Sequence, residues 1–242
     1  MKFKEAEYYR IVTLRTVGNF LILSSFFMMF RLLNQPIKEE INYYLNSFSG
    51  KKFVVVDPSS ESAEASIYNS FQNNNGQVGE LGRQLKDKNV EFLVPVDPEF
   101  SIVVPKIGAN ANILKNVTTV DKELYLESLK QGVAHAEGTA FPGEKGHIFL
   151  FAHSTDYVLN VANYNAVFYL LYKLEVDDEV NLFFKGKRYV YRVTGKQIVD
   201  PSEVEYLTRK TDSEFLTLQT CWPPGTTFKR QLVFAEPVSN LP

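Results

Sequence analysis

From about residue 91 onward, the chain consists of short apolar runs separated by turn residues, and this pattern favours a mainly β fold. The predicted strands are residues 100–104, 147–152, 180–184, 189–193, 215–221 and 231–235. The tripeptide Lys-Gly-Lys at 185–187 predicts a hairpin. Apolar residues at helical spacing predict short helices at 121–129 and 167–174. Many short strands with few helices predict a closed or nearly closed β-barrel.

The composition of the chain argues against several classes of function. A chain of 242 residues with 45% hydrophobic residues can form one domain with a substantial core plus attached segments. The net charge of −2 argues against a general nucleic-acid binder, which needs a basic surface. A single cysteine excludes an internal disulfide and a multi-cysteine metal site. The three histidines lack the i, i+4 spacing of a helical zinc motif, so we expect no metal and no cofactor.

Residues 11–33 predict a membrane-spanning helix. Their only charged residues are Arg15 and Arg31, and long arginine side chains near the ends of a span can reach the membrane interface. Basic residues before the apolar centre favour a cytoplasmic tail over residues 1–10, with the rest of the chain outside. No small-residue cleavage site follows, so we expect an uncleaved signal-anchor. A cleaved signal peptide and a buried amphipathic helix are the alternatives.

Residues 34–95 are expected to form a linker with a modest N-terminal extension. The polar stretch at 58–62 has little to bury. Short helices are expected around 37–48 and 62–71, and neither carries obvious chemistry. This segment is expected to hold the domain of residues 96–242 away from the bilayer.

Cys221 is the only cysteine and lies at the end of an alternating apolar run. Residues 222–225 (Trp-Pro-Pro-Gly) must end the strand, so the thiol is expected at a strand edge beside a loop. Arg230 follows nine positions later, on the next predicted strand. A thiolate near a guanidinium is in the electropositive setting that makes cysteine reactive. The pattern predicts a nucleophile that still needs a base, whereas a lone cysteine is ordinarily a small buried hydrophobic residue.

Four stretches, in this order, resemble the sortase family of cysteine transpeptidases: residues 102–107, 132–144, 151–154 and 217–221. Arg230 then lies on the following strand, as in that family. The resemblance covers roughly residues 96–237 and implies an eight-stranded β-barrel with short helices, preceded here by the membrane helix and the extension. One departure is Ala152, where many relatives have glycine before the catalytic histidine.

The resemblance implies a catalytic set of His153, Cys221 and Arg230. Cys221 would attack the carbonyl of a peptide bond, typically after threonine, in the C-terminal sorting signal of an exported protein and form a thioacyl-enzyme. His153 would protonate the leaving amine and deprotonate the incoming one. Arg230 cannot give up its proton, so it would hold the substrate and offset oxyanion charge. The acceptor would be an amine of the cell envelope or a protein lysine, on the extracellular side of the cell membrane.

Further residues are candidates for substrate contact. His135, Thr220 and Trp222 are expected to bind substrate, and Trp222 begins a rigid loop that varies within the family. His135 lies in a Gly-rich segment, where a structural role and the role of base are alternatives. His147 is expected to be solvated. Residues 97–100 slightly resemble the lid of pilus-building sortases, but an ordinary turn leading into the first strand is expected.

The sequence is also compatible with two other functions. The chain can be a cysteine endopeptidase that uses water as acceptor, or a catalytically silent barrel that binds exported proteins. The presence of all three catalytic residue types argues against the silent barrel.

Overall fold

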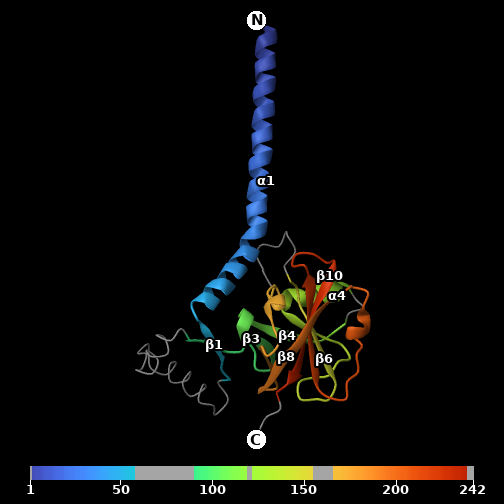
Figure 1. The fold of residues 1–242 in the computed structure, drawn as a ribbon. Helices are drawn as coiled ribbons and strands as arrows, with labels where there is room; N and C mark the ends of the chain where they lie inside the picture. Colours follow the sequence, from blue (N-terminus) through green and yellow to red (C-terminus); the bar gives the residue numbers. More distant parts are fainter. Residues whose placement is uncertain (1, 58–89, 119–121, 155–165, 239–242) are drawn as a thin grey trace. The chain divides into compact units, whose positions relative to one another are not determined.

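The computed structural model describes residues 2–57, 90–118, 122–154 and 166–238 of the chain (Figure 1). The chain divides into two compact units, Met1–Asn42 and Tyr43–Pro242. The first unit consists of most of helix α1 (Lys2–Phe48), and the second contains the end of that helix and all the strands.

Helix α1 contains the predicted membrane span. The window Glu7–Phe30 has 24 residues and a mean hydropathy of 1.5, and none of it is buried within the protein. By length and composition this helix is able to cross a membrane. Large apolar side chains such as Phe20 and Leu23 are more than 60% exposed, which is unfavourable in water and favourable in lipid. The short helix expected at 37–48 is the C-terminal part of α1, whereas the one expected at 62–71 lies outside the described residues.

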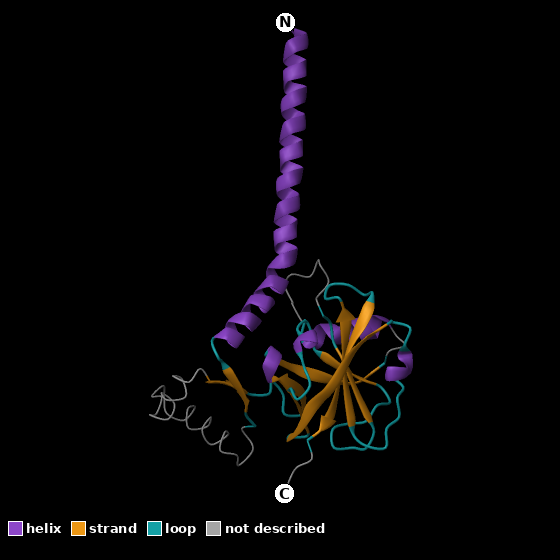
Figure 2. Cartoon of the chain, in the orientation of Figure 1, coloured by secondary structure: helices purple, strands orange, loops and turns teal. Residues whose placement is uncertain are grey.

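The second unit is a closed β-barrel, which confirms the predicted mainly β fold (Figure 2). Its strand order is β10-β8-β7-β3-β4-β5-β6-β9, and it closes between β9 and β10. The strands are β3 (Phe100–Val104), β4 (Ala109–Val117), β5 (Val133–Ala136), β6 (His147–Phe151), β7 (Glu179–Phe184), β8 (Lys187–Val199), β9 (Phe215–Trp222) and β10 (Lys229–Pro237). Most neighbours are antiparallel, but the β4–β5 and β6–β9 pairs are parallel.

The predicted hairpin joins β7 to β8. Lys185 and Gly186 both have positive φ, 51° and 73°, which is the conformation that a two-residue hairpin turn requires. The turn also binds the segment before β3, because the amide of Lys185 donates to the carbonyl oxygen of Glu99 (3.1 Å). The amide of Glu99 in turn donates to Asp97 Oδ1 (2.8 Å). Residues 97–100 therefore form the expected turn into the first barrel strand.

The two short helices predicted for the barrel region have different outcomes. The helix expected at 121–129 is confirmed as α4 (Lys122–Gln131). The helix expected at 167–174 is wrong, because the segment forms turns and the single 3₁₀ turn η2 (Leu171–Lys173). Its fully buried residues are Phe168, Leu171 and Leu174. A spacing of three matches the three residues per turn of a 3₁₀-helix, so these side chains reach the barrel core without an α-helix.

Strand β6 is buried on both faces. Ile148 and Leu150 point into the barrel core, while Phe149 and Phe151 belong to an outer apolar cluster that includes Leu129 of α4. A strand covered on both sides has a nearly continuous apolar sequence, as β6 does. Helix α4 therefore covers the outer side of this wall.

Gly132 links α4 to β5 in a space that admits no larger residue. A Cβ atom at this position would lie 2.5 Å from the carbonyl oxygen of Asn112 on β4. Glycine therefore permits the close backbone approach that starts the parallel β4–β5 pair.

The stretch expected as a linker contains two further strands. β1 (Lys52–Val55) and β2 (Val90–Leu93) form a small parallel sheet. Val55 packs against Val103 and Phe183 of the barrel, and Arg188 Nη1 donates to the carbonyl oxygen of Val55 (3.2 Å). This part of the extension is therefore attached to the outside of the barrel. Two short 3₁₀ turns, η1 (Pro105–Ile107) and η3 (Val204–Tyr206), complete the described elements.

His147 was expected to be solvated, and this prediction is wrong. It starts β6 with only 4% of its surface exposed, and its Nε2 lies 2.8 Å from the hydroxyl of Thr217. Its ring contacts Phe149 edge to face. Burial, and then the positive charge of Arg209, lower the pKa of His147 from 6.5 to about 4. The ring is therefore neutral at physiological pH.

We expect the depressed pKa of His147 to make stability depend on pH. Because protonation favours the unfolded chain, its contribution is complete above about pH 6.5 and falls as the pH drops toward 4. Between pH 7 and 4.5, the parent should lose roughly 2 to 3 kcal/mol more unfolding free energy than His147→Gln. Urea unfolding of both full-length proteins in detergent micelles, followed by the fluorescence of the single tryptophan, measures this difference. Equal pH slopes would contradict it.

Candidate active site

Strand β9 carries Cys221 on its outward face. Leu216, Leu218 and Thr220 are buried in the barrel, so the alternation of a strand turns Gln219 and Cys221 to the other side. Cys221 is half-buried, and its thiol is free. The strand therefore presents the sulfur at the wall of the barrel, one residue before its end.

Arg230 lies directly opposite Cys221. The two residues are Cα partners in the antiparallel β9–β10 pair. Opposite residues of an antiparallel ladder share one face, with Cβ atoms about 4.5 to 5.5 Å apart. Arg230 Nη1 donates to the carbonyl oxygens of Thr227 (3.2 Å) and Lys229 (3.1 Å), which restrains the guanidinium at the start of β10.

His153 approaches Cys221 from the other side of β9. In the parallel β6–β9 pair, Phe151 is the partner of Gln219. The pairing continues beyond β6, because the amide of Ala152 donates to the carbonyl oxygen of Gln219 (3.1 Å). The regular pairing ends there, and its extension by two residues along both strands brings His153 level with Cys221. The carbonyl oxygen of His153 also accepts a hydrogen bond from the amide of Phe168 (3.3 Å), which fixes the backbone there.

The structure thus brings the three predicted catalytic residues to one end of the barrel wall. Cys221 occupies the middle of the row, with His153 on one side and Arg230 on the other. Burial raises the pKa of the Cys221 thiol, and the charge of Arg230 opposes this by lowering it. Burial is the larger effect, so the resting thiol is mainly protonated at neutral pH.

Thr220 connects the two strands of this row. Its side chain is only 4% exposed, and its hydroxyl donates to the carbonyl oxygen of Ala152 (2.9 Å). The hydroxyl therefore holds the residue that precedes His153. This placement suits a positioning role better than the direct substrate contact expected from the sequence.

Trp222 is half-exposed at the end of β9, directly after the nucleophile. Its ring lies 5.2 Å from the ring of Tyr172, centroid to centroid. The sequence does not single out Tyr172, because the prediction for its segment is a short helix defined by other, apolar residues. The two aromatic residues form a surface beside Cys221 that a bound peptide can contact.

His135 lies away from this row, inside the barrel. It has no exposed surface, and its ring stacks on Phe141 at a centroid distance of 4.5 Å. The amide of Asn116 donates to Nδ1 (3.4 Å), so Nε2 carries the proton and donates to the carbonyl oxygen of Ala140 (2.9 Å). Burial lowers the pKa of His135, although the bond to Ala140 opposes this. A substrate in solution does not reach this ring, so its place in the structure is that of a structural residue.

Tyr125 of α4 is a second residue that the sequence did not single out. Burial raises the pKa of its phenol, the charge of Cys221 adds to this, and the charge of Arg230 opposes it. The phenol therefore lies within electrostatic reach of both groups. No sequence signal marks it, because a tyrosine in an amphipathic helix is ordinarily a packing residue.

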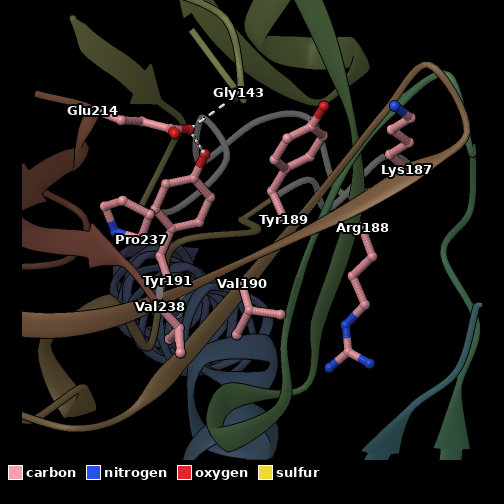
Figure 3. Close-up of a pocket in the computed structure, with 9 residues that line it drawn as sticks. All are labelled: Gly143, Lys187, Arg188, Tyr189, Val190, Tyr191, Glu214, Pro237 and Val238. Carbon is pink, nitrogen blue, oxygen red and sulfur yellow. Dashed lines mark hydrogen bonds between the residues drawn. The ribbon is translucent and has the colours of Figure 1, made fainter. Parts of the chain in front are cut away.

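A cavity of about 370 Å³ lies at the opposite end of β9 (Figure 3). Glu214, just before the strand begins, accepts hydrogen bonds there from the amide of Gly143 (2.9 Å) and from the hydroxyl of Tyr191. Both bonds go to Oε1 and connect the start of β9 to β8 and to the loop at Gly143, so the carboxylate stabilises this end of the barrel. Within the described residues, no group of three or more His, Cys, Asp or Glu is close enough together to hold a metal ion.

Comparisons with known proteins agree with this geometry. A family model described as "Sortase domain" matches residues 102–238, which is more than half of the chain. Sortase D of Bacillus subtilis (strain 168) is 27% identical over 139 residues, which are 56% of this chain and 62% of that protein. The chain therefore matches less than two thirds of the length of this curated relative.

A solved structure of a sortase shows the same fold. A Streptococcus agalactiae Sortase C1 structure has a TM-score of 0.50 at 24% identity, over 68% of this chain and 75% of that one. A Clostridium perfringens Sortase D5 transpeptidase has a TM-score of 0.48 at 22% identity, over 72% and 94% of the two chains. The resemblance read from the sequence motifs is confirmed, and the chain belongs to the sortase family, whose members are cysteine transpeptidases.

Proposed function

We propose that this chain is a membrane-anchored cysteine transpeptidase that cleaves a C-terminal sorting signal of exported proteins and transfers the acyl part to an amine. The observation that carries the proposal is the position of Cys221 in register with Arg230 on one neighbouring strand and level with His153 on the other. A nucleophile, an imidazole that can move a proton and a permanent cation in one row suit acyl transfer.

The reaction has two halves. His153 takes the proton of the Cys221 thiol as the sulfur attacks the peptide carbonyl carbon, and it gives this proton to the departing amine as the C–N bond breaks, which leaves a thioester. His153 then takes a proton from an incoming amine as this amine attacks the thioester, and it returns the proton to the departing Cys221 sulfur. Arg230 stays charged throughout and offsets the negative oxygen of both tetrahedral intermediates.

Helix α1 supports the proposed membrane attachment and sidedness. Its apolar window and the basic residues near the N-terminus favour a single-pass anchor with the barrel on the extracellular side. There the enzyme would meet exported proteins and amines of the cell envelope or of protein lysines. Trp222 and Tyr172 would contact the bound peptide, because they form the exposed aromatic surface nearest to the nucleophile along β9.

We expect Cys221→Ala to abolish thioacyl formation and His153→Ala to reduce turnover by at least 10²-fold, since general acid–base catalysis contributes about that much. The measurement is mass spectrometry of the full-length protein after incubation with a peptide library that has threonine at the cleavage position. Products are compared with and without an added amine. Amine-dependent ligation supports transfer, and a hydrolysed product that amine does not affect indicates an endopeptidase. A Cys221→Ala variant that ligates as fast as the parent would refute the proposal.

We expect Arg230→Met to slow alkylation of Cys221 by iodoacetamide about tenfold at pH 7.5. The guanidinium lowers the pKa of the thiol, so its removal leaves less thiolate at a pH below that pKa. Lys229→Met is the matched control, because Lys229 is the adjacent cation but pairs with Asp200 (2.7 Å). The control should alkylate at the parental rate. Equal rates for both variants would show that Arg230 does not act on the thiol.

We expect Thr220→Val to reduce the rate of thioacyl formation and to lower the unfolding free energy by about 1 to 2 kcal/mol. Valine keeps the shape but leaves the buried carbonyl of Ala152 without the hydroxyl donor. Thr220→Ser keeps the donor and should retain most of both properties. Unfolding in urea and single-turnover acylation measure the two effects. A valine variant that acylates at the parental rate would show that the hydrogen bond from Thr220 to Ala152 does not position His153.

A further inference from the structure

Tyr125 is held beside the catalytic row by an aromatic stack. Its ring lies 5.2 Å from that of Phe151, centroid to centroid, with only 12° between the planes. Phe151 ends β6, two residues before His153, and is level with Gln219, two residues before Cys221. The stack therefore places the Tyr125 phenol on the outside of the barrel wall, at the level of Phe151 and Gln219. These two residues come two positions before His153 and Cys221.

The charges of the row act on this phenol. Both the Cys221 thiolate and the Arg230 guanidinium influence the ionisation of Tyr125, in opposite directions. Burial raises the pKa of the phenol further, so the hydroxyl stays protonated at neutral pH and is a neutral hydrogen-bond donor.

Among the described residues, no backbone or side-chain hydrogen bond involves the hydroxyl of Tyr125. The side chain is half-buried. A donor that is held beside the catalytic row and has no partner among the described residues is available to a group of the substrate.

We propose that Tyr125 is a substrate-contacting residue, whose hydroxyl donates a hydrogen bond to a carbonyl oxygen of the peptide bound alongside Cys221. This inference rests on the proposed transpeptidase function and adds a residue to its substrate site. A peptide chain offers a carbonyl acceptor at every residue, and a tyrosine is suited to this contact because its ring loses little conformational freedom on binding.

The test compares Tyr125→Phe with the parent, both as full-length protein in detergent micelles. Phenylalanine keeps the stack on Phe151 and removes only the donor. With the library of peptides that carry threonine at the cleavage position, we expect thioacyl formation on Cys221 to slow about threefold to tenfold, which is the effect of one neutral hydrogen bond. The rate of Cys221 alkylation by iodoacetamide, measured from about pH 6 to 10, should be unchanged. This small probe has no peptide chain that Tyr125 could hold.

Tyr206→Phe is the matched control. Tyr206 also stacks on a phenylalanine of the barrel wall, Phe234, at a centroid distance of 6.1 Å. This variant should acylate at the parental rate. Parental acylation by Tyr125→Phe, or equal slowing of its acylation and alkylation, would overturn the inference while leaving the transpeptidase intact. A parent that forms no thioester with any peptide would overturn both.

Discussion

The parallel pairing of β6 with β9 is the constraint on which the site depends. Parallel strands have their carboxyl ends at the same edge of a sheet, so residues that follow the two strands must lie close together. His153 follows β6, and Cys221 lies one residue before the end of β9. The chain leaves β6 and forms β7 and β8 before it returns as β9, so this neighbour relation is made by residues far apart in sequence. The antiparallel turn into β10 then adds Arg230 at the same edge.

Burial on both faces keeps this pairing in register. A shift of one residue would move Ile148 and Leu150 out of the core and Phe149 and Phe151 into it, so both apolar clusters oppose slippage. The hydroxyl of Thr220 continues the connection past the end of β6, where the regular ladder has stopped. The outer cluster has a second effect, because α4 must lie on it, and α4 brings the phenol of Tyr125 to the row. Packing that stabilises the wall therefore also determines what surrounds the nucleophile.

Sequence reasoning predicted the strands that are continuous apolar runs and missed those that are not. β4 has polar residues at many positions, and β5 has only four residues, so neither has a strong periodic signal. The sequence predicted Cys221, His153 and Arg230 as a set, but their alignment depends on pairings between strands that are distant in sequence. His147 is a second residue whose environment depends on parts of the chain that are distant in sequence. Its neighbours in sequence suggest a solvated strand start, while its burial comes from Thr217 and Arg209, which the fold brings to it.

In the proposed reaction, partial burial and the charge of Arg230 act in opposite directions on the Cys221 thiol. A fully exposed thiol would ionise more readily, but the thioester formed on it would also be open to water. Partial burial raises the pKa of the thiol and limits access to the same atoms, and Arg230 recovers part of the lost thiolate without opening the site. Because the cation is restrained by two backbone carbonyls, it is in place before charge develops on the carbonyl oxygen.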